Sequence, residues 1–372
     1  MALYELDEFQ GPQFLGFVRN LPTPYPFLGE TWLPNQPTFD LSFDYILGAY
    51  NRPVMATVMG WDAEAPIAGR IPFGPKVTGE LPPVKRKARI SEKEIIRFLT
   101  PRAGTPDLQN AIDSVYNLSA QLIDSVQARV EWLRMQALSE LTMVVNEGGA
   151  VFNFDFGKTP GLFYDLVAGV DGAGVPITNA ATVGGAAGGP LDGSGGAPNP
   201  ATPVQFLQSI CNRMQFTYGF RPVELVCSRK VLYMLLNDPS IRQLIRGSNA
   251  PAAILARAEL DTLFALYDLP QLTVYDASAN QENADGSLSQ IRMMAENKCF
   301  LLPPPEIELG QTLWGPTAES RVLLGTGLAG QAPGVFASTY VTTDPPSEWV
   351  KAAATAFPTL PGANLLASAK LY

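Results

Sequence analysis

Apolar residues recur every three or four positions over residues 108–141, which is the spacing of one face of an α-helix. Thr105 and Pro106 provide an N-cap and a first-turn proline, and neither Gly nor Pro interrupts residues 107–145. A helix of these 39 residues is about 58 Å long, longer than a small domain is wide. Its polar positions give no clean heptads, so we expect a spine across an extended subunit rather than a coiled-coil strand. The side chains expected to pack this helix on a sheet are Leu118, Leu122, Val126 and Val130.

The chain before this helix favours extended structure. Six prolines lie among aromatic residues over positions 9–38, and they predict an extended arm that cannot become a long helix. Apolar β-type residues at 53–60 and a second β-type run at 85–90 predict the two sides of a long hairpin.

The pattern after the helix predicts a separate α/β lobe. Residues 168–203 contain ten Gly and five Pro, a composition typical of disorder unless another chain packs on it. From residue 204 onward, helical and strand patterns alternate. The expected helices are 204–216, 228–237 (capped by Ser228) and 252–266, and the expected strands are 224–227, 272–275, 299–302 and 335–343.

The hairpin is basic, whereas the chain as a whole is acidic. Over residues 70–102, nine Lys and Arg stand against three Glu, a local charge of +6, while the whole chain carries −9. This split favours contact between one copy's arm and another copy's body, and a solvated hairpin is the alternative. Nucleic-acid binding is less favoured, because the acidic body would repel phosphate and the basic residues are not interleaved with a set of aromatic residues for stacking. The candidate intersubunit residues are Lys76, Lys85, Arg86, Lys87 and Arg89.

The amino-acid composition excludes most common kinds of catalytic site. The chain has no His, which excludes Ser-His-Asp triads, Cys-His dyads and His-ligated metal sites. Cys211, Cys227 and Cys299 form no CxxC motif and are expected to be buried small hydrophobes in a reducing compartment. The GxGxxG pattern at 325–330 is followed by Pro333 where a dinucleotide fold needs a helix. We therefore expect no catalytic, cofactor-binding or metal site.

The remaining composition bears on the surface of the protein. Only 16% of the residues are charged and 33 are proline, which suits either a surface covered by neighbouring subunits or a Pro-rich irregular protein. The acidic residues 1–8 lack the layout of a signal peptide, and no apolar run is long enough to cross a membrane. We expect a protein that is neither secreted by that route nor membrane-spanning.

Three stretches give the chain a resemblance to a known family. They are VELVCS at 223–228, FLLPPPEIELG at 300–310 and VTTDPP at 341–346. In the order arm, basic hairpin, spine helix, lobe and terminal β segment, the chain resembles the lambda-type major capsid proteins of tailed double-stranded-DNA phages. The resemblance covers nearly the whole chain, although the Gly/Pro-rich loop replaces the family's usual stretch before the lobe.

The resemblance implies an α+β fold of the Hong Kong 97 type. Its parts would be an N-terminal arm (1–47), an extended loop (48–104), a peripheral domain with the spine helix (105–202), an axial domain (203–311) and C-terminal peripheral strands (312–372). It implies a virion shell of pentamers and hexamers, assembled in the host cytoplasm around double-stranded DNA that is not bound specifically. Scaffold, portal and decoration proteins would be further partners. The alternatives are a bacterial encapsulating shell of the same fold and a cytosolic α/β enzyme with its site in the lobe.

Overall fold

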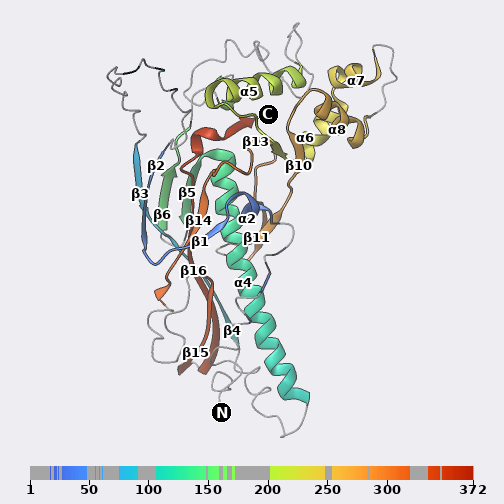
Figure 1. Ribbon diagram of the computed structural model, residues 1–372. Coiled ribbons are helices and arrows are strands. Elements are labelled where there is room, and N and C mark those ends of the chain that lie inside the picture. Colours follow the sequence, from blue (N-terminus) through green and yellow to red (C-terminus); the bar gives the residue numbers. More distant parts are fainter. Residues whose placement is uncertain are drawn as a thin grey trace. The chain divides into compact units, whose positions relative to one another are not determined.

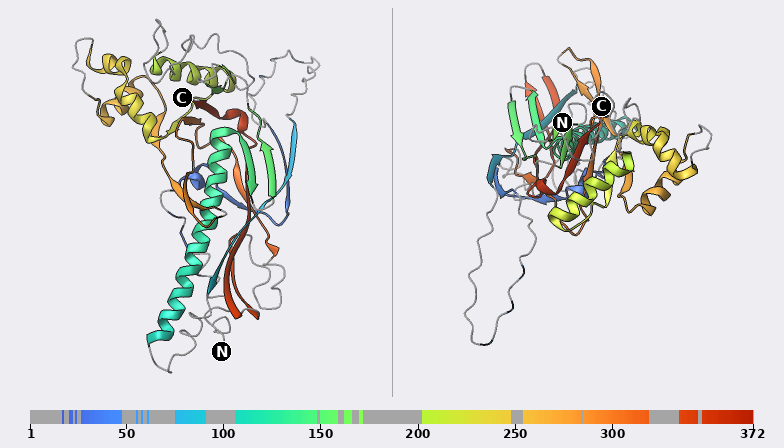
Figure 2. Two further views of the ribbon diagram at one scale, coloured as in Figure 1. Left: turned by 180° about the vertical axis from the view of Figure 1, so that it is seen from behind. Right: turned by 90° about the horizontal axis from the view of Figure 1, so that it is seen from above.

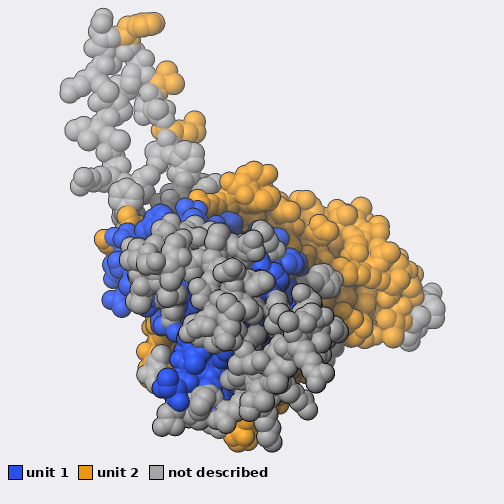
Figure 3. Space-filling view, turned by 90° about the horizontal axis from the view of Figure 1, so that it is seen from below, with its two compact units in different colours: residues 1–44, 78–134, 311–359 blue, residues 45–77, 135–310, 360–372 orange. Residues whose placement is uncertain are grey.

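The computed structural model divides into two compact units (Figure 1, Figure 3). Unit 1 comprises residues 1–44, 78–134 and 311–359, and unit 2 comprises residues 45–77, 135–310 and 360–372. None of the helices in the described part of the chain is long and apolar enough to cross a membrane. Apart from a few isolated positions, the structure describes residues 27–47, 75–90, 106–147, 150–158, 162–165, 170–171, 202–247, 254–283, 285–318, 334–343 and 346–371.

Unit 1 is built on a five-stranded sheet. Its strands are β1 (Asn35–Pro37), β4 (Pro83–Ile90), β14 (Gln311–Gly315), β15 (Phe336–Thr343) and β16 (Pro346–Thr359). The long strand β16 pairs antiparallel with β4, β14 and β15, and β1 adds to β14 in parallel. The short helix α2 (Gly29–Trp32) precedes β1. The β-type run predicted at 85–90 is therefore a real strand, but its partner is the C-terminal strand β16.

The spine helix packs along this sheet. It is α4 (Pro106–Glu140), and Figure 2 shows it in teal beside the brown and red strands β15 and β16. Val126 and Val130 share one buried core with Val350 and Ala352 of β16. The helix has 35 residues rather than the 39 predicted.

The prediction is wrong at the C-terminal end of the helix. Leu141 adopts a left-handed conformation with φ 54°, and its N–H still donates to the carbonyl oxygen of Ala137 at 3.2 Å. The next residues form strand β5 (Thr142–Glu147), which pairs antiparallel with β6 (Ala150–Asp155). The β-branched side chains of Thr142, Val144 and Val145 favour this strand over a further helical turn.

Unit 2 contains a six-stranded mixed sheet in the order β10-β9-β13-β17-β7-β8. β9 (Glu224–Cys227) pairs parallel with β10 (Gln271–Val274) and antiparallel with β13 (Lys298–Leu302). The last strand, β17 (Ala367–Lys370), lies between β13 and β7 (Phe163–Asp165), which pairs with β8 (Val170–Asp171). A short 3-10 helix, η3 (Ala363–Leu365), leads into β17.

In the described part of unit 2, the helices are α5 (Pro203–Tyr218), α6 (Arg229–Asn237), α7 (Pro239–Arg246) and α8 (Arg257–Leu266). Ser228 caps α6 as predicted, and Thr202 forms a capping box with Gln205 at the start of α5. Helix α7 was missed, although Asp238 before Pro239 is an N-cap signal, since its carboxylate accepts from the N–H groups of Ser240 and Ile241.

Smaller differences between the predicted and observed elements concern their boundaries and the two-stranded sheets. The helix expected at 252–266 begins at Arg257, and the strand expected at 224–227 is confirmed as β9. β11 (Ser278–Glu282) and β12 (Leu288–Arg292) form a hairpin, and β2 (Ser42–Ile46) pairs with β3 (Lys76–Glu80). The β-type run at 53–60 lies largely outside the described residues, as does the Gly/Pro-rich stretch 168–203. The GxGxxG pattern at 325–330 lies wholly outside them.

The two units cut across the predicted domain boundaries. Residues 135–202 and 360–372 were assigned with the spine helix, yet both belong to unit 2. At the C-terminus the reason is strand pairing, because β17 bonds to β13 and β7 rather than to the sheet of unit 1.

Candidate assembly surface

The basic run of the predicted hairpin lies on β4, along one side of β16. Arg89 is in register with Trp349, Lys87 with Lys351, Arg86 with Ala352 and Lys85 with Ala353. All four basic side chains are exposed. Lys76 is also exposed, but it begins β3 and is not part of this sheet.

Strand alternation separates these basic residues onto two faces. Val84, Ala88 and Ile90 of β4 pack with the core formed against α4, so Arg86 shares their side of the sheet. Lys85, Lys87 and Arg89 therefore lie on the opposite, outer face. In the sequence these basic residues form one continuous run. In the strand, Lys85, Lys87 and Arg89 lie together on the outer face, and Arg86 lies on the other face.

Aromatic and hydroxyl groups lie between the cations on the outer face. The rings of Trp349 and Tyr340 stack with centroids 6.3 Å apart and planes within 8°. The Nζ atom of Lys87 lies 4.4 Å from the centroid of the Trp349 ring. Arg89 Nε donates to Ser347 Oγ at 2.9 Å, which orients the guanidinium along the sheet.

The candidate spine residues lie in the core of unit 1. Leu122, Val126 and Val130 are at most 5% exposed, and Leu118 is half-buried against the same cluster. Their partners on the sheet are mainly small: Ala337, Val350, Ala352, Ala354 and Ala356. Small side chains on β16 let the helix approach closely.

A buried ion pair fastens the N-terminal arm to the spine, and the sequence analysis did not identify it. Glu131 is fully buried and Arg134 is 3% exposed, with Arg134 Nη1 3.5 Å from Glu131 Oε2. The other carboxylate oxygen of Glu131 accepts from the N–H groups of Leu28 and Gly29 at 3.1 and 2.9 Å. Gly29 is required there, because a Cβ atom would lie 2.5 Å from Glu131 Oε2.

Arg134 extends this network to the sheet. Its Nε donates to Thr312 Oγ1 at 2.8 Å, and its Nη2 donates to Asn35 Oδ1. The same Asn35 oxygen accepts from Trp314 Nε1 at 2.7 Å. One helix turn thus holds α2, β1 and β14 together. In the sequence, this network is visible as two opposite charges three residues apart, Glu131 and Arg134, near the C-terminal end of the apolar stripe of the helix.

The three cysteines are not nucleophiles. All are free and buried, as predicted. Burial raises the pKa of the Cys211 thiol to about 11 and that of Cys227 to about 12, and it raises the pKa of Cys299 as well. These thiols are therefore protonated at neutral pH and serve as packing groups.

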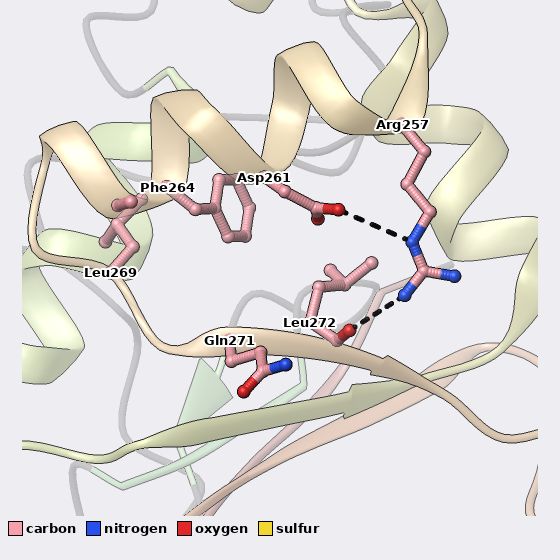
Figure 4. A pocket seen from close by; sticks show the side chains of 7 residues that line it. Arg257, Asp261, Phe264, Leu269, Gln271 and Leu272 are labelled. Atoms are coloured by element: carbon pink, nitrogen blue, oxygen red, sulfur yellow. Dashed lines mark hydrogen bonds and ion pairs between the residues drawn. The ribbon is translucent and has the colours of Figure 1, made fainter.

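A small cavity of about 240 Å³ lies between α8 and the edge strand β10 (Figure 4). Its polar groups bond to one another. Arg257 Nε lies 3.7 Å from Asp261 Oδ2, and Arg257 Nη2 donates to the carbonyl oxygen of Leu272 at 3.1 Å. Within the described residues, no cluster of His, Cys, Asp or Glu could hold a metal ion.

Solved structures share this fold over the full length of the chain. A prophage protein of E. coli CFT073 assigned as a capsid protein has a TM-score of 0.59 at 14% identity, covering 100% of both chains. A phage-related protein from Bordetella bronchiseptica RB50 has a TM-score of 0.51 at 15% identity, covering 97% of both. At such identities the likeness concerns the fold, which is the Hong Kong 97 type. A comparison with curated proteins found no match.

The sequence itself matches a family model over nearly its whole length. The model is described as phage major capsid protein E, and it matches residues 13–175 and 190–371. The family is one of structural shell proteins, so the enzyme alternative is set aside, and the phage shell is favoured over a bacterial encapsulating shell. The chain belongs to the phage major capsid protein E family, and it assembles in many copies into the shell of a phage head.

Proposed function

We propose that the basic loop of each subunit seats it on an adjacent subunit of the phage head. The contacts would come from Lys76, Lys85, Arg86, Lys87 and Arg89. The observation that carries this proposal is the row of exposed cations along β4, on a chain whose net charge is −9. Complementary charge on the acidic body of a neighbour would select the partner and fix the register.

Charge reversal tests this role. The Arg86→Glu/Lys87→Glu variant is expected to give fewer shells and shells that dissociate at lower salt, because like charges would then meet at the contact. Shell yield is measured by sedimentation and negative-stain imaging over a salt series. Unchanged yield and unchanged salt resistance would contradict the proposal.

The parts of the fold would then have distinct tasks. Residues 1–47 act as an arm and 48–104 as the loop that overlaps a neighbour. The spine helix and the strands of residues 312–359 form a peripheral plate, and residues 203–311 meet at the centres of pentamers and hexamers. Leu118, Leu122, Val126 and Val130 keep the plate rigid by holding α4 on its sheet. The apolar contacts of these four residues with β15 and β16 support this assignment.

The wider assembly follows from the shell function. We infer that scaffold, portal and decoration proteins join the shell, that it assembles in the host cytoplasm, and that it encloses double-stranded DNA without specific binding. Co-expression with the neighbouring phage genes, followed by mass analysis of purified heads, tests the partners. Heads containing this chain alone would contradict that part of the proposal.

A further inference from the structure

The outer face of the unit 1 sheet gathers four cations from two distant segments. Lys85, Lys87 and Arg89 come from β4, and Lys351 joins them from β16, in register with Lys87. Glu348 is the one carboxylate among the described residues of β4, β15 and β16. It alternates to the other face, where it is 5% exposed and in register with Ile90 of the core. We call these four cations, with Trp349 and Tyr340, the cationic face.

The cationic face suits a particular kind of ligand. Its centre is the stacked pair Trp349 and Tyr340, with Lys87 already over the Trp349 ring. Both rings are half-buried, so they form a floor between the charged side chains. Carboxylates would pair with the cations, and aromatic side chains would pack on the floor. An acidic peptide that also carries aromatic residues matches both properties.

The chain itself contains such a peptide. Residues 4–9 read Tyr-Glu-Leu-Asp-Glu-Phe, with three carboxylates in four positions between two aromatic residues. We call Glu5, Asp7 and Glu8 the acidic segment, and it lies outside the described residues. Three carboxylates against four cations give close charge complementarity.

The stretch of chain before Phe17 sets how far the acidic segment can reach. The ring of Phe17 packs edge-on against Tyr116 of α4 with centroids 4.9 Å apart, which anchors the arm at that point. The nine residues 8–16 precede Phe17. Fully extended, they span about 30 Å, which is enough to reach across a contact between subunits.

We infer that in the shell the acidic segment of one copy docks on the cationic face of a second copy. This rests on the proposed function, in which the basic loop contacts a neighbour, and it names the group on that neighbour. The contact joins different surfaces of identical chains, so it repeats from copy to copy around a closed shell. Lys351, Trp349 and Tyr340 become interface residues that no hairpin pattern could identify.

A mixing experiment tests the docking in trans. The face variant is Lys85→Glu/Arg89→Glu/Lys351→Glu, and the arm variant is Glu5→Lys/Asp7→Lys/Glu8→Lys. Each variant alone places like charges together and is expected to give at least about tenfold fewer shells. Mixed in equal amounts, each acidic face meets a basic arm and each basic face meets an acidic arm, so the yield is expected to recover. Circular dichroism of each variant confirms that it is folded.

The controls separate this inference from the proposed function. Arg86→Glu reverses a single charge on the other face of β4, and mixing with the arm variant should not rescue it. If the face variant assembles poorly while the arm variant assembles normally, the basic contact stands but the acidic segment is not its partner. If the face variant assembles normally, both ideas fail. If both variants fail singly and their mixture also fails, the docking in trans is overturned.

A binding assay decides between peptide and nucleic acid. A fluorescent peptide of residues 1–12 is added to the full-length arm variant, whose own segment no longer competes. Saturable binding that weakens with salt and is lost in the face variant supports the inference. Binding of a DNA duplex without binding of the peptide would overturn it and assign the face to phosphate.

Discussion

The two units of this capsid protein stabilise themselves in different ways. In unit 1 the long helix α4 packs on a sheet whose contribution to the core is largely alanine. In unit 2 several helices bring large side chains to the sheet, among them Leu207, Leu235 and Leu263. Small side chains bring backbones close together, whereas large ones bury more apolar area per residue.

The difference extends to the ion pairs. In unit 1 Glu131 and Arg134 are almost wholly buried and bond to three separate segments. In unit 2 the Arg246 and Glu259 side chains of a typical pair are 27% and 34% exposed. The comparison shows that unit 1 replaces apolar volume with a buried polar network that only one arrangement of its segments satisfies.

The strongest way to break this comparison is to remove one partner of the buried pair. Glu131→Ala leaves the Arg134 charge buried and is expected to lower the free energy of unfolding by about 3–5 kcal/mol. Glu259→Ala, at a more exposed pair that also helps to cap α8, should cause a much smaller loss in the same denaturant titration. Similar losses for the two variants would mean that burial of the pair does not distinguish the units.

The next largest effect on stability is expected from shortening an apolar side chain in the core of unit 1. Leu122→Ala is expected to lower the free energy of unfolding by about 2–5 kcal/mol, because the short alanine side chains of the facing sheet cannot fill the cavity that it leaves. Leu118, on the same helix, is only half-buried, and Leu118→Ala provides a matched control with a clearly smaller loss. Equal losses in thermal unfolding of the unassembled chain would show that packing on the sheet does not set the stability of the spine.

In unit 2, loss of a helix cap should have a moderate effect. Ser228 Oγ accepts from the Val231 N–H at 3.3 Å and donates to the Glu296 carbonyl at 2.6 Å. Ser228→Ala is therefore expected to cost about 1–2 kcal/mol. Thr262→Ala, at an exposed site within α8, should change unfolding by less than about 0.5 kcal/mol. A cap variant as stable as the wild type would contradict the assigned role.

The smallest effect concerns pH. The hydrogen bond from Arg246 lowers the pKa of Glu259 below its usual value. Because the folded pKa is the lower one, the stabilisation is complete above the ordinary carboxyl pKa and is lost as the pH falls from there through the lowered pKa of the folded state. NMR titration of Glu259 should show the lowered pKa, and Arg246→Gln should raise it toward the usual range, although the N–H of Ala256 continues to lower it. A pKa unaffected by that substitution would rule out the hydrogen bond as the cause.

Local signals in the sequence predicted local structure well. Strand β9 and helix α6 follow from a short apolar run and a capping serine, because their residues interact mainly within the segment. The end of the spine helix was misplaced because residues 142–145 can continue an apolar stripe or begin a strand. Helix propensity does not distinguish these two outcomes. The pairing of β5 with β6 selects the strand.

The assembly surface could be predicted only in part. The basic run on β4 is visible in the sequence, but its division into two faces requires the register with β16. Lys351 and Trp349 carry no sign that they adjoin that run, since they lie about 260 positions away and pair through the sheet. Glu131 and Arg134 likewise look like ordinary polar interruptions until Asn35 and Thr312 lie beside them.

The pairing of β4 with β16 also sets an order of events during synthesis. Arg89 and Ser347, which bond across the two strands, are 258 positions apart. At about 5–20 residues per second, a ribosome needs roughly 10–50 s to reach the second after making the first. Until then β4 lacks its partner and the cationic face lacks Lys351, so a nascent chain cannot present a complete surface.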